Sequence, residues 1–358
     1  MGKIEWCDVT WNPITGCTHA GTPGCDNCYA RRMAKRLAGR YGYPEKPNEF
    51  DVTYHADKVV LRGPRDWKKS RVVFVCSMGD LFHKDVSWRY HLMPIYAVMG
   101  MAPQHVFLVL TKRPIHALGF YSFMHEQEIR RRWGGSPLMW PLPNVYLGDS
   151  VENQDAMWRI PELLKIPAAK YFVSFEPLLG PIDEDQLRAY LHGCPEAVGG
   201  GVHYVTHDMA LDACAPEMEG MRIDEEPDWV QTMPPIDGVI VGGESGPGAR
   251  PMHPDWPRSI RDQCTEAGTP FSFKQWGEWR PGFAGDEPQE VVGVYPWYEG
   301  WRTACELAVS EKHENRLVLG KVASMARVGK AQAGRLLDGQ LWNQWPWDVI
   351  GGMGADAE

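Results

Sequence analysis

Three cysteines, Cys17, Cys25 and Cys28, lie within twelve residues near the start of this chain of 358 residues. Their spacing, C-x7-C-x2-C, provides three thiolates without a fourth at a matching distance. Soft thiolate ligands favour iron–sulfur clusters, and three of them leave one iron of a four-iron cluster open. Because an open iron can hold a cofactor or a substrate, the triplet indicates chemistry rather than a structural staple.

A zinc site is the alternative for the same cysteines, because structural zinc usually takes four ligands in a tetrahedron. His19 lies inside the triplet and Cys7 lies ten residues before Cys17, so either could supply a fourth ligand. Closed zinc sites favour paired C-x2-C halves, which makes the cluster our expectation. A zinc-bound nucleic-acid-binding protein without enzymatic activity stays as the alternative.

Composition limits the class of protein. The chain has a hydrophobic content of 44%, nine cysteines and a net charge of −9, as in a globular protein of a reducing compartment. The acidic balance excludes a global basic field, so nucleic acid would need a local basic patch. We find no apolar run of membrane-spanning length and no apolar stretch typical of a signal peptide. We therefore expect a cytoplasmic protein with no membrane partner.

Seven short β-rich runs with helix-compatible stretches between them predict an α/β protein with a parallel sheet. The runs are Val9–Thr15, Arg71–Ser77, His105–Thr111, Asn144–Gly148, Lys170–Phe175, Gly238–Val241 and Pro270–Lys274. Polar and ionisable residues follow each run, at the strand ends where parallel barrels and open α/β sheets place their active sites. We expect six or seven β/α units that form a partial or full TIM-like barrel.

The segments around these runs predict additions to the barrel. Residues 1–183 would form its amino-terminal part with the cysteine loop, and residues 234–280 would supply its last strands. Residues 184–233, rich in glycine and acidic residues, predict an insertion or lid. Residues 281–358 predict a C-terminal helical extension, because RVGKAQAGRLLDGQLWNQWP has the pattern of a basic amphipathic helix.

Eight motifs along the chain resemble a phage-associated branch of the radical S-adenosylmethionine (SAM) superfamily. They are TWNPITGCTHAGTPGCDNCYARRMA, CSMGDLFHKDV, LTKRP, YLGDSVEN, FVSFEPLLGPI, VGGESGPGARPMHPDW, FKQWG and VGKAQAGRLLDGQLWNQWP. The resemblance runs from about residue 5 to 347 and is poor over residues 184–233. The common superfamily spacing is C-x3-C-x2-C with an aromatic residue before the third cysteine, where this chain has a longer loop and Asn27.

The resemblance implies a barrel of the radical SAM type with a [4Fe-4S] cluster on Cys17, Cys25 and Cys28. SAM would chelate the fourth iron, and an electron from a reductant such as flavodoxin or ferredoxin would cleave it to a 5′-deoxyadenosyl radical that abstracts hydrogen. A phage member of this branch is assigned as the isomerase of thymine hypermodification, a means of restriction evasion. The resemblance therefore implies conversion of N-alpha-glycinylthymine to C-alpha-glycinylthymine in viral DNA, in the host cytoplasm. Repair in the manner of spore photoproduct lyase is the alternative within the superfamily.

Candidates for SAM binding follow the second, fourth and sixth strands of the expected sheet. They are Ser77, Asp80, Ser150, Glu152, Asn153, Gly242, Gly243 and Glu244. The resemblance places the SAM amino group near Asp80, which could instead cap the following helix. The serine, glutamate and asparagine after the fourth strand suit the SAM carboxylate and ribose, with a capped loop as the other interpretation. The two glycines permit close backbone approach to a ligand.

Asp80, Glu176 and Lys274 are the candidate catalytic residues. A carboxylate at Glu176 could contact the SAM ribose or a substrate amine, and Lys274 could hold a carboxylate or phosphate, as could Lys112 and Arg113. The other interpretation is that these cations form ion pairs with Asp80 or Glu176.

DNA contacts are expected from basic clusters and from tryptophans that could stack on a flipped base. The candidates are Arg31, Arg32, Lys35, Arg36, Arg40, Arg130–Arg132, Lys321, Arg327, Lys330 and Arg335, with Trp276, Trp279 and Trp297. Solvated helix faces are the other interpretation of the basic clusters.

Overall fold

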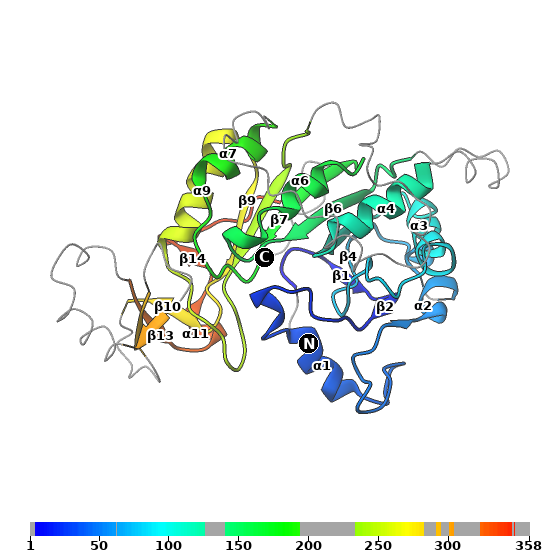
Figure 1. Ribbon diagram of the computed structural model, residues 1–358, viewed down its shortest axis with the longest axis horizontal. Coiled ribbons are helices and arrows are strands. Elements are labelled where there is room, and N and C mark those ends of the chain that lie inside the picture. Colours follow the sequence, from blue (N-terminus) through cyan, green and yellow to red (C-terminus); the bar gives the residue numbers. More distant parts are fainter. Residues whose placement is uncertain are drawn as a thin grey trace.

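The computed structural model describes residues 4–61, 63–125, 140–193, 233–282, 291–294, 301–303, 323–345 and 347. Seven parallel strands form its central, curled sheet, in the order in which they occur along the chain (Figure 1). They are β1 (Val9–Trp11), β4 (Val72–Val75), β5 (Val106–Thr111), β6 (Val145–Ser150), β7 (Lys170–Phe175), β8 (Gly238–Gly242) and β9 (Phe271–Gln275). β1 and β9 are the two edges, so the described strands form a half barrel. The expected parallel α/β architecture is confirmed in its partial form.

The strands are apolar on both faces because each face is covered. Val73, Val75 and Phe107 belong to the core under the outer helices. Alternate residues such as Phe74 and Leu108 point to the inner face. There they pack with a second group of large side chains, which are Trp6, Tyr146, Phe172, Ile240 and Trp347. Burial on two sides explains the near-continuous apolar runs of these strands. The second group, called the inner aromatic group below, fills the bottom of the half barrel.

In the described part of the chain, helices cover the outer face of the sheet (Figure 1). They are α3 (Met93–Gly100), α4 (Pro114–His125), α6 (Arg159–Leu164), α7 (Glu184–His192) and α9 (Asp255–Ala267). The side chain of Asp183 accepts a hydrogen bond from the backbone of Gln186 at the start of α7, and Gly193, at φ 68°, ends the helix. α7 opens the segment expected to be an insertion, yet it packs beside α9 in the helical layer; residues 194–232 lie outside the described part.

The remaining short elements lie mainly around the cysteine loop and the first crossover. They are β2 (Ile14–Thr15), the 3-10 turn η1 (Pro23–Cys25), α1 (Tyr29–Leu37), β3 (Thr53–Tyr54), α2 (Ala56–Val60), η2 (Pro64–Asp66), the π-helical turn η3 (Trp88–Leu92) and η4 (Gln154–Ala156). β2 and β3 form a small antiparallel pair.

The prediction of a helical C-terminal extension is wrong for the part that the structure describes. β10 (Trp279–Pro281), β11 (Val291–Val294), β12 (Trp301–Thr303) and β13 (Ala323–Arg327) form an antiparallel sheet. The expected basic helix is a four-residue helix, α11 (Lys330–Ala333), followed by the hairpin of β14 (Leu336–Leu337) and β15 (Gln340–Leu341). Glycines 329, 334 and 339 adopt φ of 82°, 77° and 78°. Since a helix cannot continue through such positions, they divide the amphipathic pattern.

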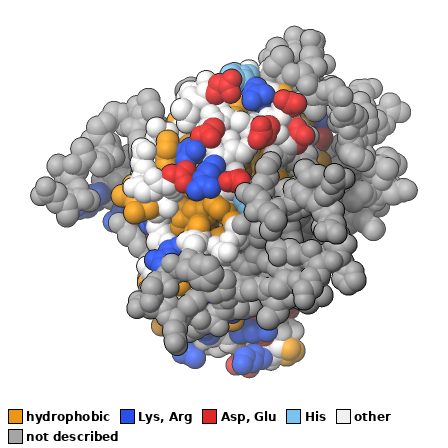
Figure 2. All heavy atoms as spheres, turned by 90° about the vertical axis from the view of Figure 1, so that its left-hand side faces the viewer, with side chains coloured by type: hydrophobic (Ala, Val, Ile, Leu, Met, Phe, Trp, Pro, Cys, Tyr) orange, Lys and Arg blue, Asp and Glu red, His pale blue; other side chains and the backbone are white. Residues whose placement is uncertain are grey.

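The face formed by α7 and α9 carries acidic and basic side chains in alternation (Figure 2). Arg188 pairs with Asp185 and Glu266, while Arg258 and Arg261 both pair with Asp338 of the β14–β15 turn. These arginines therefore form ion pairs within the protein. In the described ranges, no helix has the length and apolar character that crossing a membrane requires.

Candidate active site

The loop that carries the three cysteines lies over the carboxyl ends of the strands. It begins at Gly16, whose backbone forms a bridge with Gly79 after β4 and donates to the carbonyl of Met78 at 2.9 Å. Gly16 has φ of 86°, and a Cβ atom there would lie 2.1 Å from the carbonyl oxygen of Asp51. Only glycine can therefore start the loop in this position.

The first fixed point of the loop is Arg113, directly after β5. Its Nη1 donates to the Sγ of Cys17 at 3.4 Å and to Asp80 at 2.8 Å, and its Nη2 donates to the carbonyl of Thr18 at 3.0 Å. The carboxylate of Asp80 also accepts from Thr111 Oγ1 at 2.8 Å. Burial opposes ionisation of Asp80, but Arg113 and the other donors hold its pKa below the ordinary value. Asp80 thus orients Arg113 against the loop.

The second fixed point is Glu152, which follows β6 and has no exposed surface. Its Oε1 accepts from Thr22 Oγ1 at 3.0 Å and pairs with Lys112, while its Oε2 accepts from Arg159 at 3.2 Å. A Cβ atom on Gly24 would lie 2.6 Å from this carboxylate, so the glycine makes room for it. Glu152 therefore joins the middle of the cysteine loop to β5, β6 and α6.

The third fixed point is the pair of Glu244 and Arg250 after β8. Arg250 Nη2 donates to Glu244 at 2.7 Å and to the carbonyl of Pro23 at 2.7 Å. Glu244 also accepts from the amide of Asn27 at 3.2 Å. Asn27, the residue before the third cysteine, thus ties Cys28 to the β8 exit.

An ion pair lies on the inner face between the strand ends. Lys274 Nζ is 2.9 Å from Glu176 Oε1, and their side chains keep 19% and 14% of their exposure. Ser174 Oγ donates to the other oxygen of Glu176 at 3.1 Å. A Cβ atom on Gly242 would lie 2.6 Å from Glu176 Oε1, so this glycine accommodates a side chain of the protein itself. Gly243 packs in the same way against the backbone of Trp276.

Two of the ion pairs offered as the other interpretation are formed, Arg113 with Asp80 and Lys274 with Glu176. Lys112 pairs with Glu152 rather than with Asp80 or Glu176. Two other candidates make local hydrogen bonds. Ser77 Oγ donates to the side-chain oxygen of Asn12 at 3.1 Å, and Ser150 Oγ donates to the carbonyl of Glu176 at 3.2 Å. Asn153 is buried at the start of η4.

The three cysteines are half-buried. Arg113 lies beside Cys17, and the charge of Lys112 interacts with Cys25 and Cys28. Burial raises the pKa of the Cys17 thiol to about 11, with the charge of Asp80 adding to this shift and Arg113 opposing it. No group of three His, Cys, Asp or Glu side chains in the described residues is arranged to bind a single metal ion. A four-iron cluster holds its cysteine sulfurs farther apart than the ligands of one ion. In donor type and number, three soft thiols on one loop next to Arg113 and Lys112 match such a cluster.

The two residues considered as a fourth zinc ligand are placed differently. Cys7 precedes β1 and is buried with the inner aromatic group, at the opposite end of the strand from Cys17. Burial raises its thiol pKa to about 12. His19 stays in the loop, where its Nε2 lies 3.0 Å from Asp26 and its Nδ1 accepts from the backbone of Gly21.

The expected tryptophan stacking surfaces are not found at two positions. Trp276 and Trp279 are 4% and 1% exposed, and their indole nitrogens donate to the carbonyls of Leu336 and Ala249. They are core residues of the half barrel and its extension. Trp297 lies outside the described residues, as do residues 130–132 and 321.

Several of the basic residues expected to contact DNA have partners inside the protein. Arg32 donates to the carbonyl of Ser245 at 3.0 Å, and Arg335 donates to the carbonyl of Lys274 at 2.9 Å. Arg31, Lys35, Arg36 and Arg40 are exposed, on α1 or just after it.

Sequence reasoning missed Thr22 and Arg159 as parts of the site. A signal for Arg159 exists, because an arginine within the apolar run WRIPELL must find a partner if the helix is buried, and it is 1% exposed. Thr22 gave no signal, since a threonine before a Pro-Gly turn is common on any loop.

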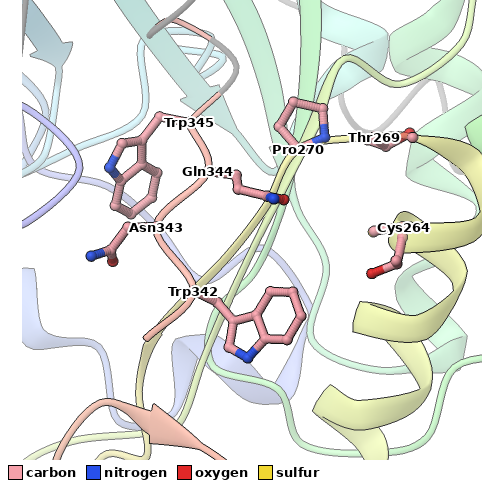
Figure 3. A pocket seen from close by; sticks show the side chains of 9 residues that line it. Cys264, Thr269, Pro270, Trp342, Asn343, Gln344 and Trp345 are labelled. Carbon is pink, nitrogen blue, oxygen red and sulfur yellow. The ribbon is translucent and has the colours of Figure 1, made fainter. Parts of the chain in front are cut away.

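A groove of about 520 Å³ lies at the amino end of β9, next to Pro270, Trp342, Gln344 and Trp345 (Figure 3). Gln344 already accepts a hydrogen bond from the backbone of Phe271 at 3.1 Å. Because Lys274 and the cysteine loop belong to the carboxyl end of the sheet, this groove is separate from the candidate site.

Comparison with known proteins places the chain in a family. No curated protein and no solved structure matches it. The model of a family described as "Protein of unknown function (DUF5131)" matches residues 1–346. Since this match covers nearly the whole length, including every strand of the half barrel and all three cysteines, the chain belongs to the DUF5131 family.

Proposed function

We propose that this protein is a radical SAM enzyme that isomerises N-alpha-glycinylthymine to C-alpha-glycinylthymine in DNA. The observation that supports the proposal most is the position of the cysteine loop, which contacts the exits of β5, β6 and β8 through Arg113, Glu152 and Glu244. The carboxyl end of a parallel barrel is where this fold carries its active sites. The loop motif TWNPITGCTHAGTPGCDNCYARRMA, with the motifs at the strand ends, supplies the resemblance to the superfamily.

Cys17, Cys25 and Cys28 would hold a [4Fe-4S] cluster. When bound, the cluster supplies the electron that cleaves SAM and so generates the radical that abstracts hydrogen. The inner aromatic group closes the bottom of the half barrel, with Trp6 and Phe172 at 3% and 1% exposure. This packing excludes water from one side of the reacting centre.

The ion pair of Glu176 and Lys274 supports the substrate class. The glycinyl group of the substrate carries an amine and a carboxylate, which complement this pair in charge. Glu176 would accept a hydrogen bond from the amine and Lys274 would bind the carboxylate, so that each side chain replaces its ion-pair partner with a group of the substrate. The reaction removes a hydrogen from the glycinyl methylene, moves the attachment from nitrogen to carbon, and returns a hydrogen. The product contains the same atoms as the substrate, so no external oxidant is needed.

DNA would approach the same end of the molecule. Arg31, Lys35 and Arg36 are exposed on α1, the helix that directly follows Cys28. They would neutralise phosphates close to the mouth of the half barrel, which gives an acidic protein the local basic patch that it needs.

The first test is anaerobic reconstitution with iron and sulfide, followed by SAM and dithionite. We expect about four irons per chain, because that is the composition of the cluster, and formation of 5′-deoxyadenosine. Cys17→Ala, Cys25→Ala and Cys28→Ala should each lose the cluster, whereas the matched control Cys7→Ala should keep it. One zinc and no iron would overturn the enzyme class.

The second test addresses the substrate. DNA that contains N-alpha-glycinylthymine is compared with UV-irradiated DNA, and the products are identified by nucleoside mass spectrometry and chromatography. We expect an isomer of unchanged mass only from the modified DNA. Repair of a photoproduct, with no reaction on the glycinyl base, would replace the isomerase with the lyase-type activity.

A further inference from the structure

Arg113 contacts the sulfur of a cysteine that is proposed to hold the cluster. Its Nη1 lies 3.4 Å from the Sγ of Cys17. The same guanidinium donates to the carbonyl and the hydroxyl oxygen of Thr18, the next residue of the loop, at 3.0 and 3.3 Å. A charged donor is thus directed at one of the three sulfurs.

The guanidinium is held in place by Asp80. The two side chains are 2.8 Å apart and keep only 13% and 8% of their exposure. The carboxylate is itself fixed by the backbone of Phe82 at 3.0 Å and the backbone of Lys112 at 3.2 Å. Because a buried, multiply bonded carboxylate has little freedom, the cation beside Cys17 cannot move away easily.

The surroundings of Cys25 differ. Its sulfur is approached by the backbone of Ala20 at 3.5 Å and the hydroxyl of Thr22 at 3.7 Å. Both hydrogen-bonding groups are neutral, and the cation near Cys25, Lys112, is paired with Glu152. Charge-assisted donors interact about twice as strongly as neutral ones. The charge of Arg113 therefore acts on the Cys17 side of the loop.

We propose that Arg113 and Asp80 tune the reduction potential of the cluster through Cys17, with opposite signs. The inference rests on the proposed function, since it needs a cluster on the three cysteines. In the step concerned, a flavodoxin- or ferredoxin-type donor loses one electron and the cluster gains it, without a proton or a bond. The added negative charge is stabilised by the cation at the thiolate and destabilised by the carboxylate behind it.

The test compares three variants with the wild type: Arg113→Gln, Asp80→Asn and the double variant. Iron and sulfide are measured first, and the midpoint potential is then obtained by dithionite titration with mediators, followed by electron paramagnetic resonance. Arg113→Gln should lower the equilibrium constant for reduction about tenfold, a fall of about 59 mV for one electron. Asp80→Asn should raise the potential, and the double variant should return toward the wild type.

Arg32→Gln is the matched control, because Arg32 also fixes this region but donates to the carbonyls of Ser245 and Pro247 rather than to a sulfur. Its potential should equal that of the wild type. If Arg113→Gln loses the cluster, Arg113→Lys, which keeps the charge, replaces it and should show a smaller fall. The inference would be overturned, and the proposed function left standing, if the midpoint potentials of the variants equalled that of the wild type or if both single variants shifted it in the same direction. A wild type that binds no iron–sulfur cluster would overturn the proposed function with it.

Discussion

Replacing Glu152 with Gln tests whether this buried carboxylate fixes the cysteine loop. Glu152 is completely buried and faces two cations, Lys112 and Arg159, as well as the hydroxyl of Thr22. Gln has nearly the same shape but no charge, so the variant leaves the two cations without their carboxylate. We expect a loss of folding stability together with a loop that binds iron less well.

The expected loss of folding stability depends on how deeply the cations paired with Glu152 are buried. Arg159 is 1% exposed, and removing one member of a buried pair costs about 3–5 kcal/mol. In the variant Arg159 keeps its hydrogen bond of 2.7 Å to the carbonyl of Ser150, which reduces the expected loss of stability. We therefore expect the free energy of unfolding to fall by about 3 kcal/mol, at the lower end of that range.

Urea unfolding at pH 7 measures this change, provided that the slope of the transition stays constant. The matched control is Glu162→Gln on α6, whose ion pair with Lys165 leaves both side chains 21–22% exposed. That surface pair should contribute less than about 1 kcal/mol. If Glu152→Gln costs no more than the control, the carboxylate does not stabilise the loop as we infer.

Three further changes are expected from buried groups. Burial, with the charge of Arg113 adding to it, lowers the pKa of His116 to about 4. Because only the unfolded chain readily takes up this proton, the free energy of unfolding falls as the pH drops from about 6.5 toward 4. Between pH 7 and pH 5 the wild type should lose about 2 kcal/mol of this free energy in urea unfolding, a loss that is absent from His116→Leu. Burial raises the pKa of Asp149 to about 8, so the wild type should lose about 2–3 kcal/mol between pH 6 and pH 9, a loss absent from Asp149→Asn. Gly148→Ala would place a Cβ atom 2.4 Å from the ring of Phe172, and should lower the thermal midpoint through an overpacking cost of about 1–3 kcal/mol; an unchanged midpoint would contradict the tight inner packing.

The strands could be read from the chain because burial on both faces leaves a local signal. Lys170–Phe175 has the bounds predicted from sequence, and five other runs differ by one or two residues at their ends. The run Val9–Thr15 divides into β1 and β2, which belong to different sheets. The cysteine triplet was equally visible, since ligand type and spacing are properties of the chain itself. The prediction of a helical extension was wrong because the spacing of apolar residues does not reveal that glycines 329 and 334 adopt positive φ, which interrupts the helix.

The sequence by itself determined the residue types that meet at the carboxyl ends of the strands: three thiols, the four carboxylates of Asp80, Glu152, Glu176 and Glu244, and the three cations of Lys112, Arg113 and Lys274. Only the tertiary structure decided which cation pairs with which carboxylate, because Arg113 with Asp80 and Lys274 with Glu176 are separated by 33 and 98 residues and meet only when neighbouring crossovers are packed. It also decided that Glu152 and Glu244 hold the cysteine loop through Thr22, Asn27 and Arg250, while their contact with SAM stays a prediction. A buried charge takes the partner that folding brings within reach, and that partner is not written in the local sequence.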